Sequence, residues 1–366
     1  MKLEIEKKDL LNLFGKTQNI VDKRNTMPVL VNILLEATGD RLKVMATDLE
    51  VSLTDLVPAK IAQEGKVGVS AKSLFEITRK LSDGPISLSK KENNWLEIKQ
   101  GRYLSKIVGI GHEEYPVFPD YKPQTSMKID ASVFRDMIDK TIYSVSTDET
   151  RYHLNGVYFE LSTTLKMIAT DGHRMSLVTK NVLDLPTNQT QGAIIPRKGL
   201  HEINKIIEGA DGEIRFSIEG SQFLIFYKSM TLMIRLIEGR YPDYTKFIPT
   251  NLPTKLKINT EAFLNCIERV SLLANQKSKA VLLTFLSGKL EISSNNPELG
   301  DAKEELEITY EGPILKIGFN AKYFTDILTN IKNEFIDFEL KDQSSPSLIR
   351  PHNDLSYSCV LMPMRI

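Results

Sequence analysis

Hydrophobic and polar positions follow one series of patterns that occurs three times along the chain. An apolar strand residue leads into a helix, with apolar positions three and four residues apart, at residues 5–14, 129–138 and 258–267. Asp130 and Asn259 stand where a side chain caps the first turn of such a helix. The copies are spaced by about 125 residues, and a fixed period of this kind indicates an internal repeat.

Two further patterns recur in the same order and at nearly the same spacing. A strand that ends in a polar corner occupies residues 42–48, 165–171 and 290–296, and a second helix is entered at residues 69–77, 195–203 and 319–327. The sequence Phe-Pro-Asp-Tyr at 118–121 returns as Tyr-Pro-Asp-Tyr at 241–244, each time before polar, proline-containing sequence typical of a linker. We therefore predict three domains of similar structure, which span residues 1–122, 123–249 and 250–366.

The order of elements in each repeat is helix, strands, helix, strands. This order predicts an α+β fold in which two helices pack on one face of a mostly antiparallel sheet. Three such units could be separate beads, or they could pair their edge strands into a curved array. The second arrangement hides sheet edges, which proteins normally protect, and an array of constant curvature closes most simply as a dimer.

Composition narrows the class of protein. The chain is 41% hydrophobic and 26% charged, and its 47 basic and 47 acidic side chains give a net charge of zero. These values are typical of a globular protein and argue against a nucleic-acid binder that relies on bulk positive charge. The alternating first eight residues do not resemble a leader peptide, and no apolar run is long enough to span a membrane. We expect a cytoplasmic protein in which Cys266 and Cys359 are core thiols.

The most suggestive catalytic pattern is Thr-Asp-Gly-His-Arg at residues 170–174. Asp171 and His173 could act in acid–base chemistry, but a turn that presents His173 and Arg174 at the surface explains the pattern better, since the corners in the other repeats contain no histidine. The five histidines and two cysteines match no metal-site spacing, and no phosphate-binding glycine loop is present. We therefore expect no catalytic residue, no metal and no cofactor. Two alternative functions remain open. One is a hydrolase or transferase that uses Asp171 and His173. The other is a monomeric scaffold that does not bind DNA.

Basic residues and the chain end are the remaining signals. The second helices open with Lys72, Arg197–Lys198 and Lys322, and cations at a helix start favour contact with phosphate. Residues 359–366 are apolar almost to the end, which predicts a core strand followed by a segment that packs on the protein or borders a groove. Methionine in such a segment suits several partners because its side chain is adaptable.

Several motifs together resemble the bacterial β sliding clamp family, the processivity subunit of DNA polymerase III. They are Ala-Thr-Asp-Leu-Glu (46–50), Arg-Tyr-His-Leu-Asn-Gly (151–156), Ala-Thr-Asp-Gly-His-Arg (169–174), Pro-Arg-Lys-Gly (196–199), Gly-Arg-Tyr-Pro-Asp-Tyr (239–244), Asn-Asn-Pro-Glu (295–298) and Met-Pro-Met-Arg-Ile (362–366). The resemblance covers essentially the whole chain. It implies a head-to-tail homodimer that closes into a ring around double-stranded DNA without reading its sequence.

The resemblance also implies partners and their sites. The partners are the polymerase III catalytic subunit, the clamp loader, repair polymerases, ligase and mismatch-repair proteins, which insert short motifs into a groove. Carried onto this chain, the groove comprises Leu154, Thr170, Gly172, His173, Arg174, Met175, Leu177, Pro242, Phe247, Val360, Met362, Pro363, Met364 and Arg365. The DNA contacts fall on Arg24, Lys72, Tyr152, His153, Arg197 and Lys198.

A few positions depart from the family pattern or are inferred only indirectly. Asp148 stands where a neutral amide can contact DNA, and an acid there should repel phosphate. Lys72 replaces an arginine, and His153 replaces a tyrosine. Lys246 and Phe247 change the rim of the groove, so the preference for partner peptides should differ in detail. We expect Leu273 and Glu304 at the subunit interface, where the first domain of one chain would meet the third domain of its mate.

Overall fold

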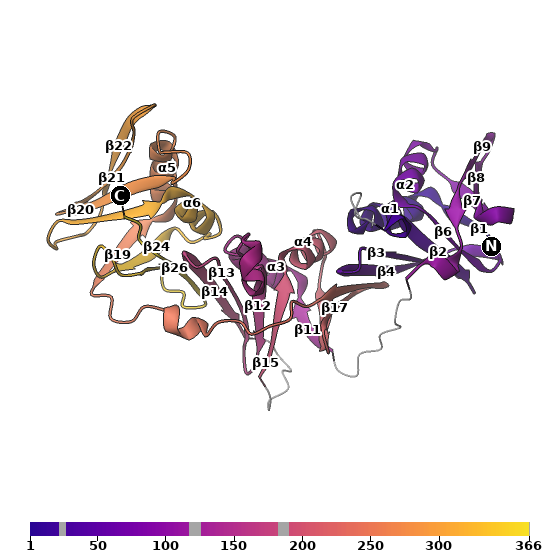
Figure 1. The fold of residues 1–366 in the computed structure, drawn as a ribbon, viewed down its shortest axis with the longest axis horizontal. Helices are drawn as coiled ribbons and strands as arrows, with labels where there is room; N and C mark the ends of the chain where they lie inside the picture. Colours follow the sequence, from indigo (N-terminus) through magenta and orange to yellow (C-terminus); the bar gives the residue numbers. More distant parts are fainter. Residues whose placement is uncertain (22–26, 117–125, 182–189, 366) are drawn as a thin grey trace. The chain divides into compact units, whose positions relative to one another are not determined.

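The structure is a computed structural model that describes residues 1–21, 27–116, 126–181 and 190–365. The chain forms two compact units, each considered by itself. Unit 1 combines residues 1–132 with 198–236, and unit 2 combines residues 133–197 with 237–366. The central repeat is therefore divided between the two units, as the chain colours in Figure 1 help to trace.

Unit 1 contains two sheets in which every described strand pair is antiparallel. The five-stranded sheet has the order β5 (Lys60–Gln63), β1 (Lys2–Glu6), β7 (Pro85–Lys90), β8 (Leu96–Gln100) and β9 (Tyr103–Ile107). The nine-stranded sheet has the order β10 (Gly109–Ile110), β6 (Gly65–Ser70), β2 (Asn32–Thr38), β3 (Arg41–Thr47), β4 (Val51–Pro58), β18 (Met230–Arg235), β17 (Gln222–Tyr227), β16 (Glu213–Glu219) and β11 (Met127–Asp130).

Unit 2 also contains two antiparallel sheets. The eight-stranded sheet has the order β15 (Gln191–Pro196), β12 (Gly156–Leu161), β13 (Leu165–Thr170), β14 (Arg174–Lys180), β26 (Tyr357–Leu361), β25 (Ser347–Pro351), β24 (Phe335–Leu340) and β19 (Thr254–Asn259). The four-stranded sheet has the order β22 (Gly300–Glu307), β21 (Lys289–Asn296), β20 (Ala280–Leu286) and β23 (Leu315–Asn320).

The strand orders show how the repeats build these sheets. Each repeat contributes two series of four strands, which we call half-sheets: β6-β2-β3-β4 corresponds to β15-β12-β13-β14 and β23-β20-β21-β22, and β1-β7-β8-β9 corresponds to β11-β16-β17-β18 and β19-β24-β25-β26. Two half-sheets from successive repeats join edge to edge, through β4 with β18 in unit 1 and through β14 with β26 in unit 2. The expectation of edge pairing between repeats is confirmed within each unit.

Helices contact strands of two sheets, which differs from the expectation of one sheet per repeat. The α-helices are α1 (Lys7–Ile20), α2 (Ala71–Lys80), α3 (Ala131–Ile142), α4 (Arg197–Ile206), α5 (Thr260–Ser271) and α6 (Ala321–Thr329). In unit 1, α1 packs beside α2 and contacts β1 of one sheet and β3 and β4 of the other. In unit 2, α5 packs beside α6 and contacts β19 as well as β20, β21 and β22. The apolar faces of these helices thus help to join two sheets.

Local sequence explains where these helices begin and which face they bury. In α1, Leu10, Leu13, Phe14 and Thr17 are buried at helical spacing. The Asn259 side chain caps α5 by accepting a hydrogen bond from the Ala262 amide, as expected. Short 3-10 helices occupy Pro28–Val31 (η1), Glu92–Asn94 (η2), His112–Glu114 (η3), Glu149–Leu154 (η4) and Tyr244–Phe247 (η5).

The interior and the surface are sharply different in chemistry. Aromatic rings from both helices and a strand of the third repeat, Phe263, Phe324 and Phe338, are fully buried against one another. Cys266 and Cys359 are buried free thiols, as expected, and burial raises the pKa of Cys266 to about 12.

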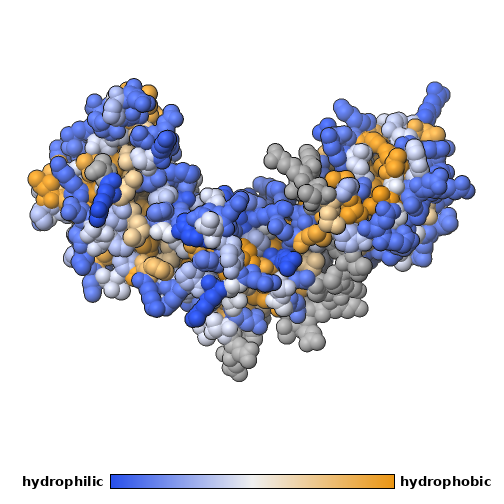
Figure 2. Space-filling view, viewed as in Figure 1, coloured by the Kyte–Doolittle hydropathy of each residue, from blue (hydrophilic) through white to orange (hydrophobic). Residues whose placement is uncertain are grey.

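Hydrophilic side chains cover most of the face in Figure 2, with apolar patches between them. No helix in the described part of the chain is long and apolar enough to cross a membrane.

Candidate functional site

The polar corner of each repeat is a structural turn in which an Asp or Asn side chain accepts a hydrogen bond from the amide two residues later. Asp48 Oδ1 accepts hydrogen bonds from the amides of Glu50 and Val51, at 3.0 and 2.8 Å. Asp171 Oδ1 accepts them from the amides of residues 173 and 174, at 2.9 and 3.0 Å. Asn296 Oδ1 accepts one from the Glu298 amide at 3.0 Å. A side chain that bonds the backbone two residues later is the usual way for Asp and Asn to build a turn, so these residues shape the corner.

The corner at residues 170–174 does not form an acid–base pair. The Asp171 carboxylate bonds backbone amides and the Arg174 Nε, at 3.1 Å, while the His173 side chain is exposed. The interpretation of a turn is therefore right, but placing Arg174 at the surface is wrong, because this residue is only 7% exposed. Three or more His, Cys, Asp or Glu side chains arranged to hold a metal ion do not occur among the described residues.

Arg174 is buried because its guanidinium has partners on every side. Its Nη1 lies 2.7 Å from Asp326 Oδ2 on α6, and its Nη2 donates to the Tyr143 carbonyl at 2.5 Å. The guanidinium carbon lies 5.2 Å from the ring centroid of Tyr143 and 4.5 Å from that of Tyr323. Two carboxylates and two aromatic faces offset the cost of desolvating a cation. Arg174 therefore joins the corner of the second repeat to a helix of the third.

An apolar groove of about 450 Å³ opens beside Arg174 on unit 2. Side chains from the corner, the η4 segment, the chain between β18 and β19, and the end of β26 line it. Nine of the predicted groove residues line it: Leu154, Thr170, Gly172, Arg174, Met175, Pro242, Phe247, Val360 and Met362. Phe247 and Met362 are 54% and 41% exposed, so two large apolar side chains face solvent at the groove.

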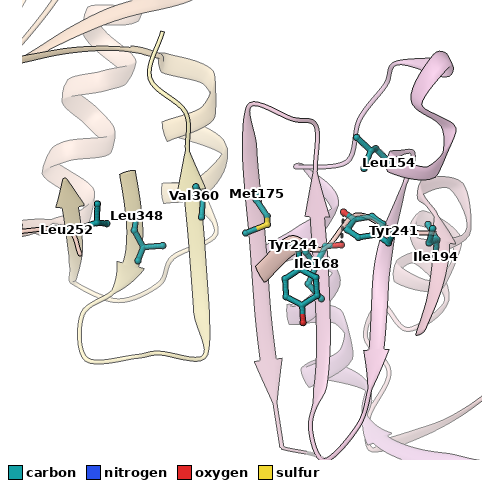
Figure 3. Close-up of a cluster of buried hydrophobic side chains, with 9 residues drawn as sticks. All are labelled: Leu154, Ile168, Met175, Ile194, Tyr241, Tyr244, Leu252, Leu348 and Val360. Atoms are coloured by element: carbon teal, nitrogen blue, oxygen red, sulfur yellow. Dashed lines mark hydrogen bonds between the residues drawn. The ribbon is translucent and has the colours of Figure 1, made fainter. Parts of the chain in front are cut away.

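A cluster of buried side chains underlies the groove. Figure 3 shows Val360 of β26 beside Met175 of β14, on the neighbouring strands that join the second and third repeats. Leu252 and Leu348 extend the cluster over the third repeat, and the aromatic rings of residues 241 and 244 extend it over the second. Buried side chains from both repeats therefore form the floor of the groove.

The other five predicted groove residues lie outside its lining. His173 lines a separate polar pocket, and Leu177 is partly buried against the cluster under the groove. Met364 is held by its amide, which donates to the Gly318 carbonyl at 2.8 Å, and the neighbouring Pro363 and Arg365 do not line the groove. Conversely, the groove contains residues that were not on the predicted list: Lys246, Ile248, Pro249, Thr250 and Pro346. Of these, only Lys246 was signalled by the sequence, as a change at the rim.

The polar pocket has a volume of about 540 Å³ and shares Arg174 with the groove. Arg197 and Lys322 are exposed cations of its lining, and Arg151 is a partly exposed one. Asp148 also lines it, and its carboxylate bonds Thr150 and lies 2.9 Å from the Arg151 Nε. Hydrogen bonds from Thr150, followed by that from Arg151, lower the pKa of Asp148. Asp148, the acid that departs from the family pattern, is thus bound by Thr150 and Arg151 of the same segment.

The remaining predicted DNA contacts have different surroundings. Tyr152 is 56% exposed on η4, and its ring meets that of His153 edge to face. Lys72 is exposed at the start of α2, 3.8 Å from Glu76. Lys198 lies 2.6 Å from the buried Asp48 carboxylate and 3.4 Å from Glu50. Arg24 falls outside the described residues, as do the repeated motif at 118–121 and the first domain boundary.

The two predicted interface residues lie on different elements: Glu304 on β22, an edge strand of the four-stranded sheet, and Leu273 just after the end of α5. Glu304, on β22, is bound by both the Nε and Nη2 of Arg269 on α5. Leu273 is partly buried, while its neighbour Leu272 is 77% exposed. The exposed leucine of this segment is therefore one position before the predicted residue.

Comparison with known proteins matches each part of the chain to one family. The family models are the DNA polymerase III beta subunit N-terminal domain over residues 1–119, its central domain over 128–243 and its C-terminal domain over 245–365. They occur in the order of the three repeats.

Full-length relatives and solved structures agree. The chain is 34% identical to the beta sliding clamp of Caulobacter vibrioides strain NA1000 over 377 residues, covering 100% of both. A crystal structure of the DNA polymerase III subunit beta from Pseudomonas aeruginosa matches with a TM-score of 0.96 at 30% identity, covering 100% of both chains. A C. crescentus beta sliding clamp with PEG bound to its "putative beta-motif tethering region" matches with a TM-score of 0.96 at 34% identity over 100% of both chains.

Proposed function

The chain belongs to the bacterial β sliding clamps, the non-catalytic processivity subunit of DNA polymerase III, and we propose that it works as a homodimeric ring on duplex DNA. The ring would tether the replicative polymerase, the clamp loader, repair polymerases, ligase and mismatch-repair proteins through the groove on unit 2. A cytoplasmic location, where bacterial DNA is replicated, belongs to the same proposal. Processivity then follows from effective concentration, because a tethered polymerase stays near the primer end without any chemistry by the clamp.

The proposal of a ring rests on two strand edges that have no partner within the described sheets, one in the first repeat and one in the third. The half-sheet ending in β4 joins one ending in β18, and the half-sheet ending in β14 joins one ending in β26. By the same rule β22 of the third repeat should join β9 of a first repeat, and in the described chain both are edge strands. In a dimer, β9 of each copy would pair with β22 of the other copy. These two joins would leave neither edge open and would give a closed head-to-tail ring.

Charge on the two edges supports this pairing. The β22 strand carries Asp301, Glu304, Glu305 and Glu307 with one lysine, whereas β9 and the turn before it carry Arg102 and Lys106. Opposite charges on facing edges favour this partner over pairing of like edges, which would place acid against acid. Tyr103 and Leu104 of β9 are exposed and would become buried by this pairing.

Contact with DNA is proposed for exposed side chains that can reach phosphate. Lys72 and Arg197 stand at helix starts, where the backbone also favours an anion. Tyr152 and His153 belong to the same predicted set of DNA contacts. Lys198 and Arg24, the latter outside the described residues, complete the set implied by the family resemblance. Phosphate contacts do not read sequence, which suits a ring that must slide, and a net charge of zero keeps equilibrium binding weak.

Retention on circular and linear DNA tests the ring. After loading by the cognate clamp loader, the protein should stay on a nicked circle and leave a linear molecule through its ends, and its solution mass should be near twice 41.4 kDa. Equal dissociation from circular DNA and from linear DNA with free ends would refute the ring.

A peptide titration tests the groove. A peptide with the C-terminal residues of the cognate polymerase catalytic subunit should bind the wild type, and Phe247→Ala or Met362→Ala should weaken it about tenfold or more, since truncating an apolar anchor removes buried area. Leu355→Ala, at a 79% exposed leucine outside the groove, is the matched control. Equal binding by all four proteins would refute the assigned site.

A further inference from the structure

One wall of the groove is a stretch of chain with little regular structure. The segment between β18 and β19 contributes Pro242, Lys246, Phe247, Ile248, Pro249 and Thr250 to the lining. Within it only the 3-10 helix η5 is regular. A wall of this kind needs an attachment to the sheet if it is to present Phe247 in one position.

Aromatic stacking supplies the first part of that attachment. Tyr241 and Tyr244 are each 7% exposed and turn their rings toward the eight-stranded sheet. The Tyr241 ring stacks on Tyr158 of β12 with centroids 4.9 Å apart and planes 7° apart. The Tyr244 ring is tilted against the same Tyr158 at 6.3 Å. Stacking fixes the height of the segment above the sheet, but a flat contact allows sliding.

A polar cluster at the end of the Tyr244 ring prevents that sliding. The Tyr244 hydroxyl donates to the carboxylate oxygens of Glu160, at 3.1 and 3.0 Å. Lys166 Nζ lies 2.8 Å from Glu160 Oε1 and 3.4 Å from the Tyr244 hydroxyl. Glu160 on β12 and Lys166 on β13 are directly paired across the two strands. The hydrogen bond that Lys166 donates to Glu160 raises the pKa of Lys166, so the ammonium of Lys166 stays charged at neutral pH.

We infer that Tyr244, Glu160 and Lys166 are positioning residues for the partner groove, although none of them lines it. Tyr244 begins η5 and Phe247 ends it, so fixing the Tyr244 hydroxyl fixes the turn that carries the rim phenyl ring. Asp243 closes the same turn by accepting from the Thr245 amide and hydroxyl. A rim ordered in advance spares the partner peptide the entropic cost of ordering it. This inference rests on the proposed function of the groove.

Tyr244→Phe tests the inference, because it removes one hydroxyl and leaves the ring. We expect the polymerase-tail peptide to bind about fivefold more weakly, with the change in the dissociation rate, as for the loss of one net hydrogen bond. Lys166→Met, which leaves all three tyrosine rings in place, should act in the same direction. Glu160→Gln should be milder, since the amide oxygen still accepts from Tyr244. Tyr310→Phe is the matched control: Tyr310 is 6% exposed and donates to the Pro313 carbonyl at 2.6 Å, away from the groove.

A double-mutant cycle with Phe247→Ala separates positioning from general stability. If Tyr244 acts by placing Phe247, Tyr244→Phe should cost much less affinity when Phe247 is already alanine. Equal loss in both backgrounds, or peptide binding by Tyr244→Phe and Lys166→Met that matches Tyr310→Phe, would overturn the inference. Wild-type protein that fails to bind the peptide would instead refute the groove. If Tyr244→Phe does not fold, Lys166→Met and Glu160→Gln carry the same test.

Discussion

Lys198 and Arg197 are neighbours at the start of α4 and have different surroundings. The Lys198 ammonium lies 2.6 Å from Asp48, whose side chain is 1% exposed, whereas Arg197 is an exposed cation of the polar pocket. Lys198→Ala should therefore destabilise the protein by about 1 kcal/mol, a figure reduced by the partial exposure of Lys198, because a buried carboxylate loses its partner. Arg197→Ala should leave unfolding in denaturant almost unchanged.

In DNA binding we expect the opposite ranking of the two variants, with the larger effect at Arg197. Arg197→Ala should lower the slope of log affinity against log salt by about one, as for one phosphate contact, and Lys198→Ala should change it less. A larger loss of salt dependence in Lys198→Ala would show that its ammonium leaves Asp48 for phosphate.

The pH dependence of the Lys198 contribution has a defined sign. Burial lowers the pKa of Lys198, but its bonds to Asp48 and Glu50 outweigh burial, so the pKa is raised above 10.5. A group with a raised folded pKa stabilises fully below its unfolded pKa and loses that contribution as pH rises through the folded value. The difference in unfolding free energy between wild type and Lys198→Ala should be constant from neutral pH to about pH 10 and shrink above 10.5. A difference that shrinks between pH 6 and 9 would contradict this assignment.

Arg174 gives the largest expected effect of a single residue. It is 7% exposed and binds both Asp171 and Asp326, so Arg174→Ala should cost about 3 kcal/mol of unfolding free energy and also weaken the partner peptide. Lys322→Ala is the control, because Lys322 approaches the same Asp326 at 3.2 Å but is 64% exposed and should matter by less than about 1 kcal/mol. Equal stability of the two variants would contradict the buried role of Arg174.

Sequence signalled some of these residues and not others, for physical reasons. Charge predicts exposure, so the pattern at 170–174 placed Arg174 at the surface, although partners from α6 and Tyr143 bury it. Those partners are distant in sequence and have no local signature. Likewise, Pro346 enters the groove from a loop of the third repeat without a motif of its own.

At the scale of elements, periodicity predicted the helix starts and corners well and the sheets only in part. Alternation along a strand defines which face is buried, but it does not say which neighbour its edge will choose. The division of each repeat into two half-sheets, with joins at β4–β18 and β14–β26, was therefore not deducible from the pattern alone. Edge pairing between repeats was predicted because an exposed edge has to be protected.

The β9 edge gives an element-scale prediction. Lys106→Glu places an acid opposite the acidic β22 strand and should weaken the dimer about tenfold, more at low salt, as seen by sedimentation across a concentration series. Lys60→Glu on β5, at the other edge of the same sheet, makes the same charge change and should leave the dimer intact. Dimers weakened equally by both changes would indicate a general charge effect and contradict β9 as the interface.

The whole molecule combines zero net charge with a proposed topological hold on DNA, and salt separates these two contributions. Phosphate contacts weaken steeply with salt, so equilibrium binding of unloaded protein to a short linear duplex should fall by orders of magnitude between about 0.05 and 0.2 M salt. Residence of loaded protein on a nicked circle should change little over that range, since escape requires opening a β9–β22 edge and not breaking phosphate contacts. Linear DNA with both ends blocked by bound protein should behave as the circle does. Residence on the circle that falls in parallel with equilibrium affinity would mean that charge, and not closure, holds the protein on DNA.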